Sequence, residues 1–387
     1  MNDNALWENI LEEFPVKKQL AYFHSAGMSP MPTRVYEAVV KAYKSLNLYG
    51  DMYFLHDLQR VEELLKRLAT MIHTSENNVC FTQNSSLAYA FLASSLKKYA
   101  PEGFNFVSLH DEFPSSVVPY EFQGIPIKYV KPVNGVYTPE MIMEAVDENT
   151  IGVLCSYVQY SNGFRLEIEK LGQMVKEKGL LFIVNATQAF PIYDIDTERM
   201  HIDALTVSFH KWGLCGVAGT LFFTSEEFRK KYPSTMAGWL GVKPPANDFI
   251  PTQKEEGFEQ LAHAGQYNFG TMNFQAYAGL NEAITFMEEI GREKIRERID
   301  QLTSYLLEKL KDIPAEILSP VDNPDHRSPI ILINLKGASN TEAVEFLRKH
   351  NIITAIRAGN IRISCNFFND KQEIDRLIRV LELYCEL

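Results

Sequence analysis

Short apolar, β-branched runs alternate along most of this chain with longer stretches of helical period. The runs predicted as strands are Val79–Thr82, Phe106–Leu109, Gly152–Ser156, Leu180–Val184, Ala204–Ser208 and Thr220–Thr224. The predicted helices between them include Leu55–Ile72, Ser86–Lys98 and Glu167–Lys178. Strands that alternate with helices of this length are typical of βαβ units. The pattern therefore predicts an α/β protein built on a parallel or mixed sheet.

The character of the sequence changes from about Gln275. We predict in order a long helix, a strand, a helix, a strand and a final helix: Ala276–Leu310, Ile330–Asn334, Asn340–His350, Ile361–Ser364 and a helix from Asp370. This order indicates a smaller α+β domain. We assign 15–270 to a large domain and 1–14 with 271–387 to the small one. The stretch Tyr232–Phe258 has weak periodicity, and we expect surface loops there.

Composition narrows the class of protein. The chain has 387 residues, 46% of them hydrophobic, which is enough for the core of a two-domain globular protein. We expect no secretory signal and no membrane span, and therefore a cytoplasmic location. The net charge of −11 argues against nucleic acid or anionic membranes as partners. Five widely spaced cysteines without a CxxC pair favour reduced thiols over disulfides or a metal site.

The segment from Ile202 to Phe223, IDALTVSFHKWGLCGVAGTLFF, carries the strongest chemical signal. A predicted strand ends at Ser208, His210 and Lys211 follow, and a glycine-spaced turn leads into the next strand. In open α/β sheets, ligands bind at the carboxyl ends of the strands. A lysine there can form an imine with an aldehyde while its neighbours bind a phosphate. A solvated surface lysine is the alternative that this segment alone leaves open.

Two further segments place polar groups at strand ends. Asn185 and Gln188 follow a buried strand and can contact the nitrogen and hydroxyl of a cofactor ring, although Asn185 could instead cap a helix. Asn84, Ser85 and Ser86 precede an apolar helix, whose free N–H groups and dipole favour an anion. Capping explains one of these hydroxyl residues, and two in tandem favour a phosphate.

Together these segments resemble the class V aminotransferase family of fold-type-I pyridoxal phosphate (PLP) enzymes, which includes cysteine desulfurases, kynureninase and isopenicillin N epimerase-like proteins. The stretch Tyr22–Pro30 is similar to the N-terminal YLDNAA stretch of the family, and Ile361–Asn369 is similar to its VRxSxxxYN signature. The resemblance implies a large domain with a mostly parallel seven-stranded sheet and a smaller α+β C-terminal domain.

The resemblance also implies the roles of individual residues. Lys211 would carry PLP as a Schiff base. The phosphate would be bound by Ser85, Ser86, Ser208 and His210. The ring would meet Asn185 at its nitrogen, Gln188 at its hydroxyl and Phe113 on its face. Gly270 and Thr271 match the GTxN turn that reaches the phosphate of the partner subunit, which implies a homodimer with shared active sites.

Arg362 is the candidate for the substrate α-carboxylate, because a guanidinium offers a planar fork that matches a carboxylate. A surface arginine paired with an acid is its alternative. Further candidates around the substrate are Arg357, Ser25, Ala26, Gly27 and Trp239, and a core position is equally open for Trp239.

The branch of the family can be narrowed. The stretches 159–165 (QYSNGFR) and 111–116 (DEFPSS) resemble the isopenicillin N epimerase-like and kynureninase-like branch. Desulfurases carry a catalytic cysteine on a loop between two arginines near the C-terminus. Here Arg357 and Arg362 are separated only by AGNI, and we expect Cys365 to be a buried thiol. Desulfuration through a cysteine on that loop is therefore not expected.

Asn185 departs from the family, which has an aspartate at this position. The carboxylate keeps the pyridine nitrogen protonated, and the protonated ring withdraws electrons from the substrate α-carbon. An amide supplies no charge. Three consequences are open: a step that needs less stabilisation, such as β-elimination; transamination with another residue tuning the ring; or PLP binding without substantial catalysis.

We predict an enzyme that acts on the α-carbon or amino group of an amino acid through Lys211. Transamination is placed first. The alternatives are β-elimination at a C–S or related bond, epimerisation or cyclisation in a biosynthetic pathway, and a non-catalytic binding protein that keeps the fold.

Overall fold

A seven-stranded sheet forms the centre of the large domain in the computed structural model, which describes residues 3–245, 250–251 and 257–386. Across the sheet the strands follow the order β2 (Val79–Thr82), β8 (Thr220–Thr224), β7 (Ala204–Ser208), β6 (Leu181–Asn185), β5 (Thr150–Ser156), β3 (Asn105–Leu109) and β4 (Ile127–Val130). All neighbours are parallel except β8, which runs antiparallel to both β2 and β7. The mostly parallel seven-stranded sheet is thereby confirmed.

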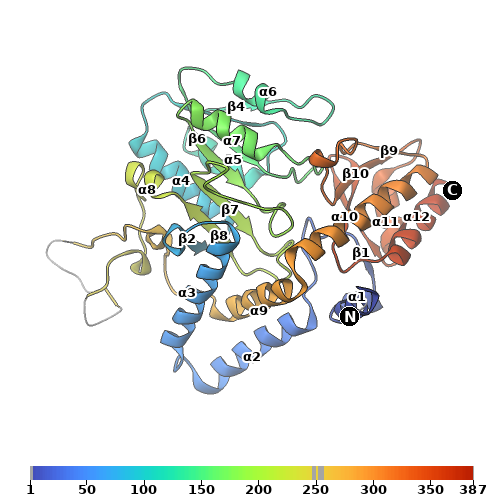
Figure 1. Cartoon of the computed structure of the whole chain (residues 1–387), viewed down its shortest axis with the longest axis horizontal. Coiled ribbons are helices and arrows are strands. Elements are labelled where there is room, and N and C mark those ends of the chain that lie inside the picture. Colours follow the sequence, from blue (N-terminus) through green and yellow to red (C-terminus); the bar gives the residue numbers. More distant parts are fainter. Residues whose placement is uncertain (1–2, 246–249, 252–256, 387) are drawn as a thin grey trace.

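Helices cover both faces of this sheet (Figure 1). One face packs against α4 (Ser85–Tyr99), α5 (Pro114–Phe122) and α8 (Glu226–Lys231). The other face packs against α3 (Phe54–Met71), α6 (Pro139–Glu144), α7 (Ile168–Glu177) and α9 (Phe274–Ile290). Consecutive residues of a central strand enter opposite cores, as Leu154 and Cys155 of β5 do. A strand buried on both faces has no polar side, which explains the continuous apolar runs.

The small domain is an antiparallel sheet in the order β12 (Ala355–Arg357), β13 (Asn360–Ser364), β10 (Ile330–Leu335) and β9 (Ala315–Ile317). Its helices are α10 (Arg292–Lys309), α11 (Asn340–Lys349) and α12 (Lys371–Cys385). Of the N-terminal part, β1 (Ala21–Tyr22) pairs with β11 (Ile352–Ile353) of this domain. The helices α1 (Asp3–Glu12) and α2 (Thr33–Tyr49) instead pack against the core of the large domain, through Ile10 and Val35. Short 3-10 turns lie at Pro15–Lys18, Glu76–Asn78, Trp239–Gly241, Ala264–Tyr267, Leu310–Asp312 and Pro324–His326.

The predicted single helix Ala276–Leu310 is wrong, because the chain breaks at Gly291 into α9 and α10. Gly291 has φ +94°, which a helix cannot contain. Helix α9 packs on α2 and α3 of the large domain, whereas Leu302 and Leu306 of α10 lie in the core of the small domain. The division at residue 270 stays a prediction.

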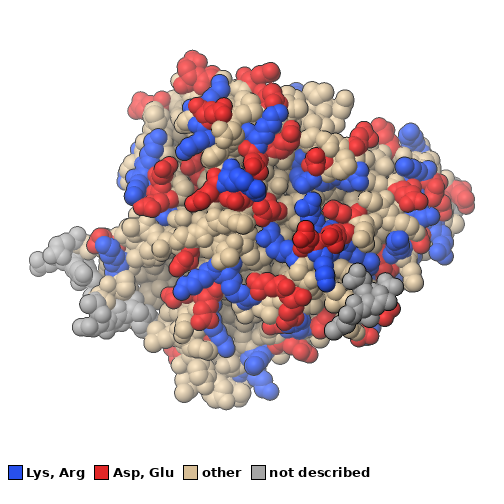
Figure 2. Space-filling view, viewed as in Figure 1, with Lys and Arg blue, Asp and Glu red and all other residues tan. Residues whose placement is uncertain are grey.

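Of the predicted strands, those that became β2, β7 and β8 have the predicted bounds, and the others shift by one or two residues. The edge strand β4 was not predicted, because its apolar run is interrupted by two residues. Lys128 is charged and half-buried, and Tyr129 is exposed. The described part of Tyr232–Phe258 contains the turn Trp239–Gly241 and an isolated bridge from Val242 to Gln260. No helix among the described residues is long and apolar enough to cross a membrane. Basic and acidic side chains intermingle over the face shown in Figure 2.

Candidate active site

Lys211 lies just past the carboxyl end of β7, in the turn that leads to β8. Its side chain is buried, and Nζ lies 4.9 Å from the centre of the Phe113 ring. Burial, together with the positive charges of Arg362 and Arg357, lowers the pKa of Lys211 to about 7. A buried amine that loses its proton near neutral pH is a nucleophile and a base, which a solvated surface lysine is not.

Phe113 comes from the turn that joins β3 to α5, so two separate segments converge here. Its ring meets Tyr160 edge to face with 5.1 Å between centres. The structure thus brings the predicted ring-stacking residue to the predicted lysine.

Asn185 ends β6 and is buried. Its Oδ1 accepts a hydrogen bond from the backbone N–H of Thr187 at 3.1 Å, and its Nδ2 donates to Oγ of Ser116 at 3.0 Å. Because a backbone N–H can only donate, the first bond fixes which end of the amide is oxygen. The amide closes a local turn, in which no helix begins, and also bonds to Ser116. Its contact with the nitrogen of a cofactor ring stays a prediction.

Gln188 is buried one turn further along the chain. Its Oε1 accepts from the Trp212 indole at 2.7 Å, and its Nε2 donates to the carbonyl of Ala26 at 3.0 Å. These bonds hold the amide between the lysine turn and the N-terminal segment. One N–H of Nε2 remains for a ring hydroxyl.

The predicted phosphate residues lie at the start of α4 and the end of β7. Asn84 caps α4 by accepting from the N–H of Leu87 at 2.9 Å. The first N–H groups of a helix have no acceptor within it, so those of Ser85 and Ser86 suit an anion. Ser208 shares a 2.8 Å hydrogen bond with Thr220. Burial, and then Lys211, lowers the pKa of His210 to about 4, so its imidazole is neutral at neutral pH.

Arg362 is buried in β13 at 1% exposure. Its Nη1 donates to the carbonyl of Tyr160 at 2.8 Å, while Nε and Nη2 have no hydrogen-bond partner among the described residues. Burial, followed by the charge of Arg357, lowers the pKa of Arg362 to about 9. Two buried donors without acceptors are costly, and a carboxylate matches them. The surface alternative for Arg362 is therefore wrong.

The N-terminal segment closes the site from the side of the small domain. Ser25 and Ala26 are fully buried, and the N–H of Ala26 donates to Ser364 at 3.0 Å. A side chain at Gly27 would overlap the ring of His24, because a Cβ there would come within 2.2 Å of Nε2. Burial lowers the pKa of His24 to about 4, with Arg362 and other cations adding to the effect.

Of the remaining predicted residues, Arg357 is close enough for its charge to lower the pKa of Lys211. A Cβ at Gly270 would come within 3.3 Å of the Trp239 indole, and Thr271 is exposed. Their neighbour Phe269 packs on Phe91 of α4 with 5.0 Å between ring centres. The half-buried Trp239 therefore adjoins the Gly270 turn. The guanidinium of Arg357 donates one hydrogen bond to the carbonyl of Ile356 at 2.6 Å.

Sequence reasoning missed His24, Glu112, Tyr160 and Trp212. Trp212 and Glu112 adjoin predicted residues in the sequence, but no motif marks them. The role of Tyr160 depends on its carbonyl, which any residue type would offer. His24 stands beside predicted Ser25, yet only the tertiary structure shows its ring above Gly27.

These residues fit a phosphorylated aromatic aldehyde with an amino-acid substrate. A buried amine with a pKa of about 7 lies over an aromatic ring, a helix N-terminus offers free N–H groups, and Arg362 holds two unsatisfied donors. The fit depends on orphaned polar atoms that a bound anion would satisfy.

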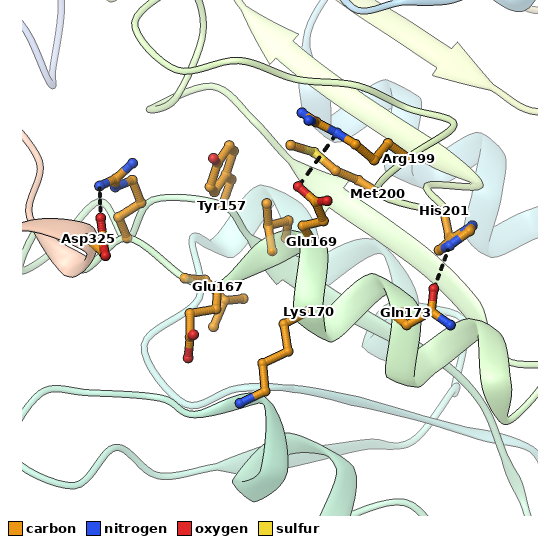
Figure 3. A pocket seen from close by; sticks show the side chains of 12 residues that line it. Tyr157, Glu167, Glu169, Lys170, Gln173, Arg199, Met200, His201 and Asp325 are labelled. Carbon is orange, nitrogen blue, oxygen red and sulfur yellow. Dashed lines mark hydrogen bonds and ion pairs between the residues drawn. The ribbon is translucent and has the colours of Figure 1, made fainter.

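A surface hollow at the start of α7 does not belong to this site (Figure 3). Its cations already meet acids, since Lys170 lies 2.7 Å from Glu140 and Arg199 lies 3.5 Å from Glu169. None of its lining residues is a predicted site residue. The chemistry therefore belongs to the Lys211 site.

Comparisons with known proteins show the family of the chain. A family model described as Aminotransferase class-V matches residues 21–379. A "Probable cysteine desulfurase" of Pyrococcus abyssi is 24% identical over 97% of this chain and 96% of its own length. The "Uncharacterized aminotransferase YcbU" of Bacillus subtilis is 22% identical, with 96% of each chain covered.

Solved structures show the same fold. The apo structure of a cysteine desulfurase from Thermococcus onnurineus NA1 superposes with a TM-score of 0.86 at 20% identity and covers 98% of both chains. The cystine C–S lyase C-DES, in complex with its reaction product cysteine persulfide, gives 0.86 at 19% identity and covers 96% of this chain and 99% of its own.

Proposed function

Because the chain belongs to the class V aminotransferase family, it is a PLP-dependent enzyme, and we propose that it cleaves the C–S bond of a sulfur-bearing amino acid by β-elimination. PLP would withdraw electrons from the substrate α-carbon. Lys211 would hold the cofactor and then, with its pKa near 7, accept the α-proton. The sulfur would leave with the bonding electrons.

The turn between Arg357 and Arg362 carries this proposal. Arg357 pairs with Asn360 across a hairpin whose turn is only Ala358 and Gly359, both with positive φ. The turn therefore contains no cysteine that could carry sulfur. Cys365 is fully buried, and burial raises the pKa of its thiol. Sulfur would therefore leave on the product and not on the protein.

The names of the relatives support sulfur chemistry, and they favour elimination over the transamination that the sequence placed first. Transamination stays the second candidate, because Lys211 and Arg362 suit it equally and one relative is named an aminotransferase. Both reactions use the same carboxylate site at Arg362.

The deciding experiment incubates the holoenzyme with cystine, cysteine and alanine. Elimination yields pyruvate and ammonia from the sulfur substrates while the cofactor stays PLP. Transamination instead accumulates the amine form of the cofactor without a 2-oxo acid acceptor. The variant Lys211→Ala should lose both the visible absorption of the bound cofactor and turnover. Lys176→Ala, at an exposed position of α7, serves as the control. Pyruvate production that survives in Lys211→Ala would refute the role of the lysine.

We also propose a homodimer in which each subunit completes the site of the other, in the cytoplasm. Support for the dimer comes from α2, whose apolar side chains Tyr36, Val40, Tyr43 and Leu46 are exposed in the single chain. The exposed Thr271 turn suits contact with a partner. The free thiols support a reducing compartment. Sedimentation of Tyr43→Asp tests the dimer: the variant should be monomeric and bind PLP weakly, and a monomeric wild type would refute the proposal.

A further inference from the structure

Glu112 is a buried carboxyl group that the proposed mechanism does not use. It is 6% exposed and lies directly before Phe113, in the turn between β3 and α5. Its oxygens accept from the backbone N–H of Phe113 at 2.8 Å and from the backbone N–H and the hydroxyl of Ser156, the former at 2.6 Å. It has no ion pair with a lysine or arginine in the described part of the chain. Three donors converge on it, so the ionised form is the one its neighbours satisfy.

Ser156, to which Glu112 is hydrogen-bonded, lies beside Asn185 in the sheet. Ser156 ends β5 and is the register partner of Asn185, which ends the parallel neighbour β6. Paired residues of neighbouring strands project from the same face of a sheet, so both side chains lie on one face. Ser116, the acceptor of the Asn185 amide, belongs to the helix that follows Glu112. The Glu112 carboxyl group and the Asn185 amide thus belong to two neighbouring strand ends, with Ser156 bonded to the first and paired in register with the second.

The other charges in the site indicate an electrostatic role for this carboxylate. The groups that lower the pKa of Lys211 besides burial are both positive, Arg362 and Arg357. Asn185 adds no negative charge at the ring nitrogen. A carboxylate in a poorly solvated interior acts over several ångströms, because little water screens it. Burial raises the pKa of Glu112, and the donors from Ser156 and Phe113 oppose that rise.

We propose that Glu112 supplies, from the neighbouring strand end, the negative charge that Asn185 lacks, and so keeps the PLP ring nitrogen protonated. This inference rests on the proposed placement of PLP at Lys211 with its ring nitrogen toward Asn185. Glu112 is a positioning residue, since its charge would act through space on the ring and not by contact with the substrate. Its electrostatic role differs from merely anchoring the turn that carries Phe113.

The test measures the ¹⁵N chemical shift of holoenzyme loaded with PLP labelled at the ring nitrogen. In the wild type we expect the shift of a protonated pyridine nitrogen. Glu112→Gln should move the shift toward the neutral form and weaken PLP binding about tenfold, the factor equivalent to one pKa unit of the ring nitrogen. Adding Asn185→Asp to Glu112→Gln should restore both, because the new carboxylate replaces the lost charge.

The rescue separates charge from anchoring. Asn185→Asp cannot restore the hydrogen bonds to Phe113 and Ser156, so a purely structural Glu112 would not be rescued. Asp203→Asn is the matched control. Asp203 is also buried, accepts from the backbone N–H of Phe182 at 2.9 Å, and lies at the opposite end of the sheet. This control should leave the ¹⁵N shift unchanged.

A neutral ring nitrogen in the wild type, or a double variant that stays neutral, would overturn the proposal. If Glu112→Gln does not fold, the wild-type shift still decides, and Glu112→Asp must keep the nitrogen protonated. Failure of the proposed function looks different: the visible absorption would persist in Lys211→Ala, or no pyruvate would form, while the ¹⁵N shifts still respond to Glu112.

Discussion

Replacing Lys211 by methionine should stabilise the PLP-free protein at neutral pH. Burial, with Arg362 and Arg357, lowers the pKa of Lys211 from 10.5 to about 7. The unfolded chain therefore binds one proton more than the folded chain between these values, and stability rises with pH there. Over that interval the free energy of unfolding changes by about 5 kcal/mol, at about 1.4 kcal/mol per pKa unit. Methionine has a similar length and no charge to bury.

The assay is urea unfolding of PLP-free wild type and Lys211→Met at several pH values. Below pH 7 the advantage of the variant should be largest, of the order of 5 kcal/mol. It should shrink by about 1.4 kcal/mol for each pH unit above 7 and vanish near 10.5. The difference between the two proteins cancels every other titrating group. Lys311→Met, at an exposed position, should show no such pH dependence.

A difference that stays constant with pH would refute the reasoning, because Lys211 would then titrate alike in the folded and unfolded chains. A destabilised Lys211→Met at pH 7 would refute it as well. In either case burial would not be what lowers the pKa of Lys211, and the lysine would not be a neutral nucleophile near pH 7.

Three other substitutions test the remaining parts of the structure. Arg362→Lys should raise the KM for substrate about 30-fold, or about 2 kcal/mol, while PLP affinity stays unchanged, because a lysine cannot present two donors to a carboxylate; an unchanged KM would contradict the carboxylate role. Gly163→Ala should destabilise the protein by about 3 kcal/mol or more in thermal unfolding, since a Cβ there would come within 2.0 Å of the carbonyl of Ile330 at φ +74°. Cys365→Ala should cost about 1 kcal/mol through lost packing and retain C–S lyase activity; loss of activity in a folded variant would show a sulfur-carrying role.

The site was predictable where its residues follow strand ends. Asn185 and Ser208 are the last residues of β6 and β7, and Lys211 follows the second by one turn. In a parallel sheet the carboxyl ends of the strands meet at one edge, so a strand pattern along the chain already places these residues together. The same rule predicts an anion site at the start of α4.

The parts of the site that the sequence did not predict depend on contacts between segments far apart in the chain. Arg362 and Tyr160 are about 200 residues apart, and their hydrogen bond joins the two domains. Sequence marks Arg362 as a charge but does not reveal that two of its donors are buried without partners. The prediction of one long helix was wrong for a local reason. The helical period of 3.6 residues continues through Gly291 in the sequence, whereas the helical backbone is interrupted there.

By itself the sequence determined the α/β class, the lysine, the departure at Asn185 and the missing cysteine beside Arg362, because each is written in residue type and local period. Only the tertiary structure decided that Lys211 is desolvated and that Glu112 reaches the strand beside Asn185. Desolvation and electrostatic proximity are properties of packed volumes, and packing brings together residues that no local pattern connects.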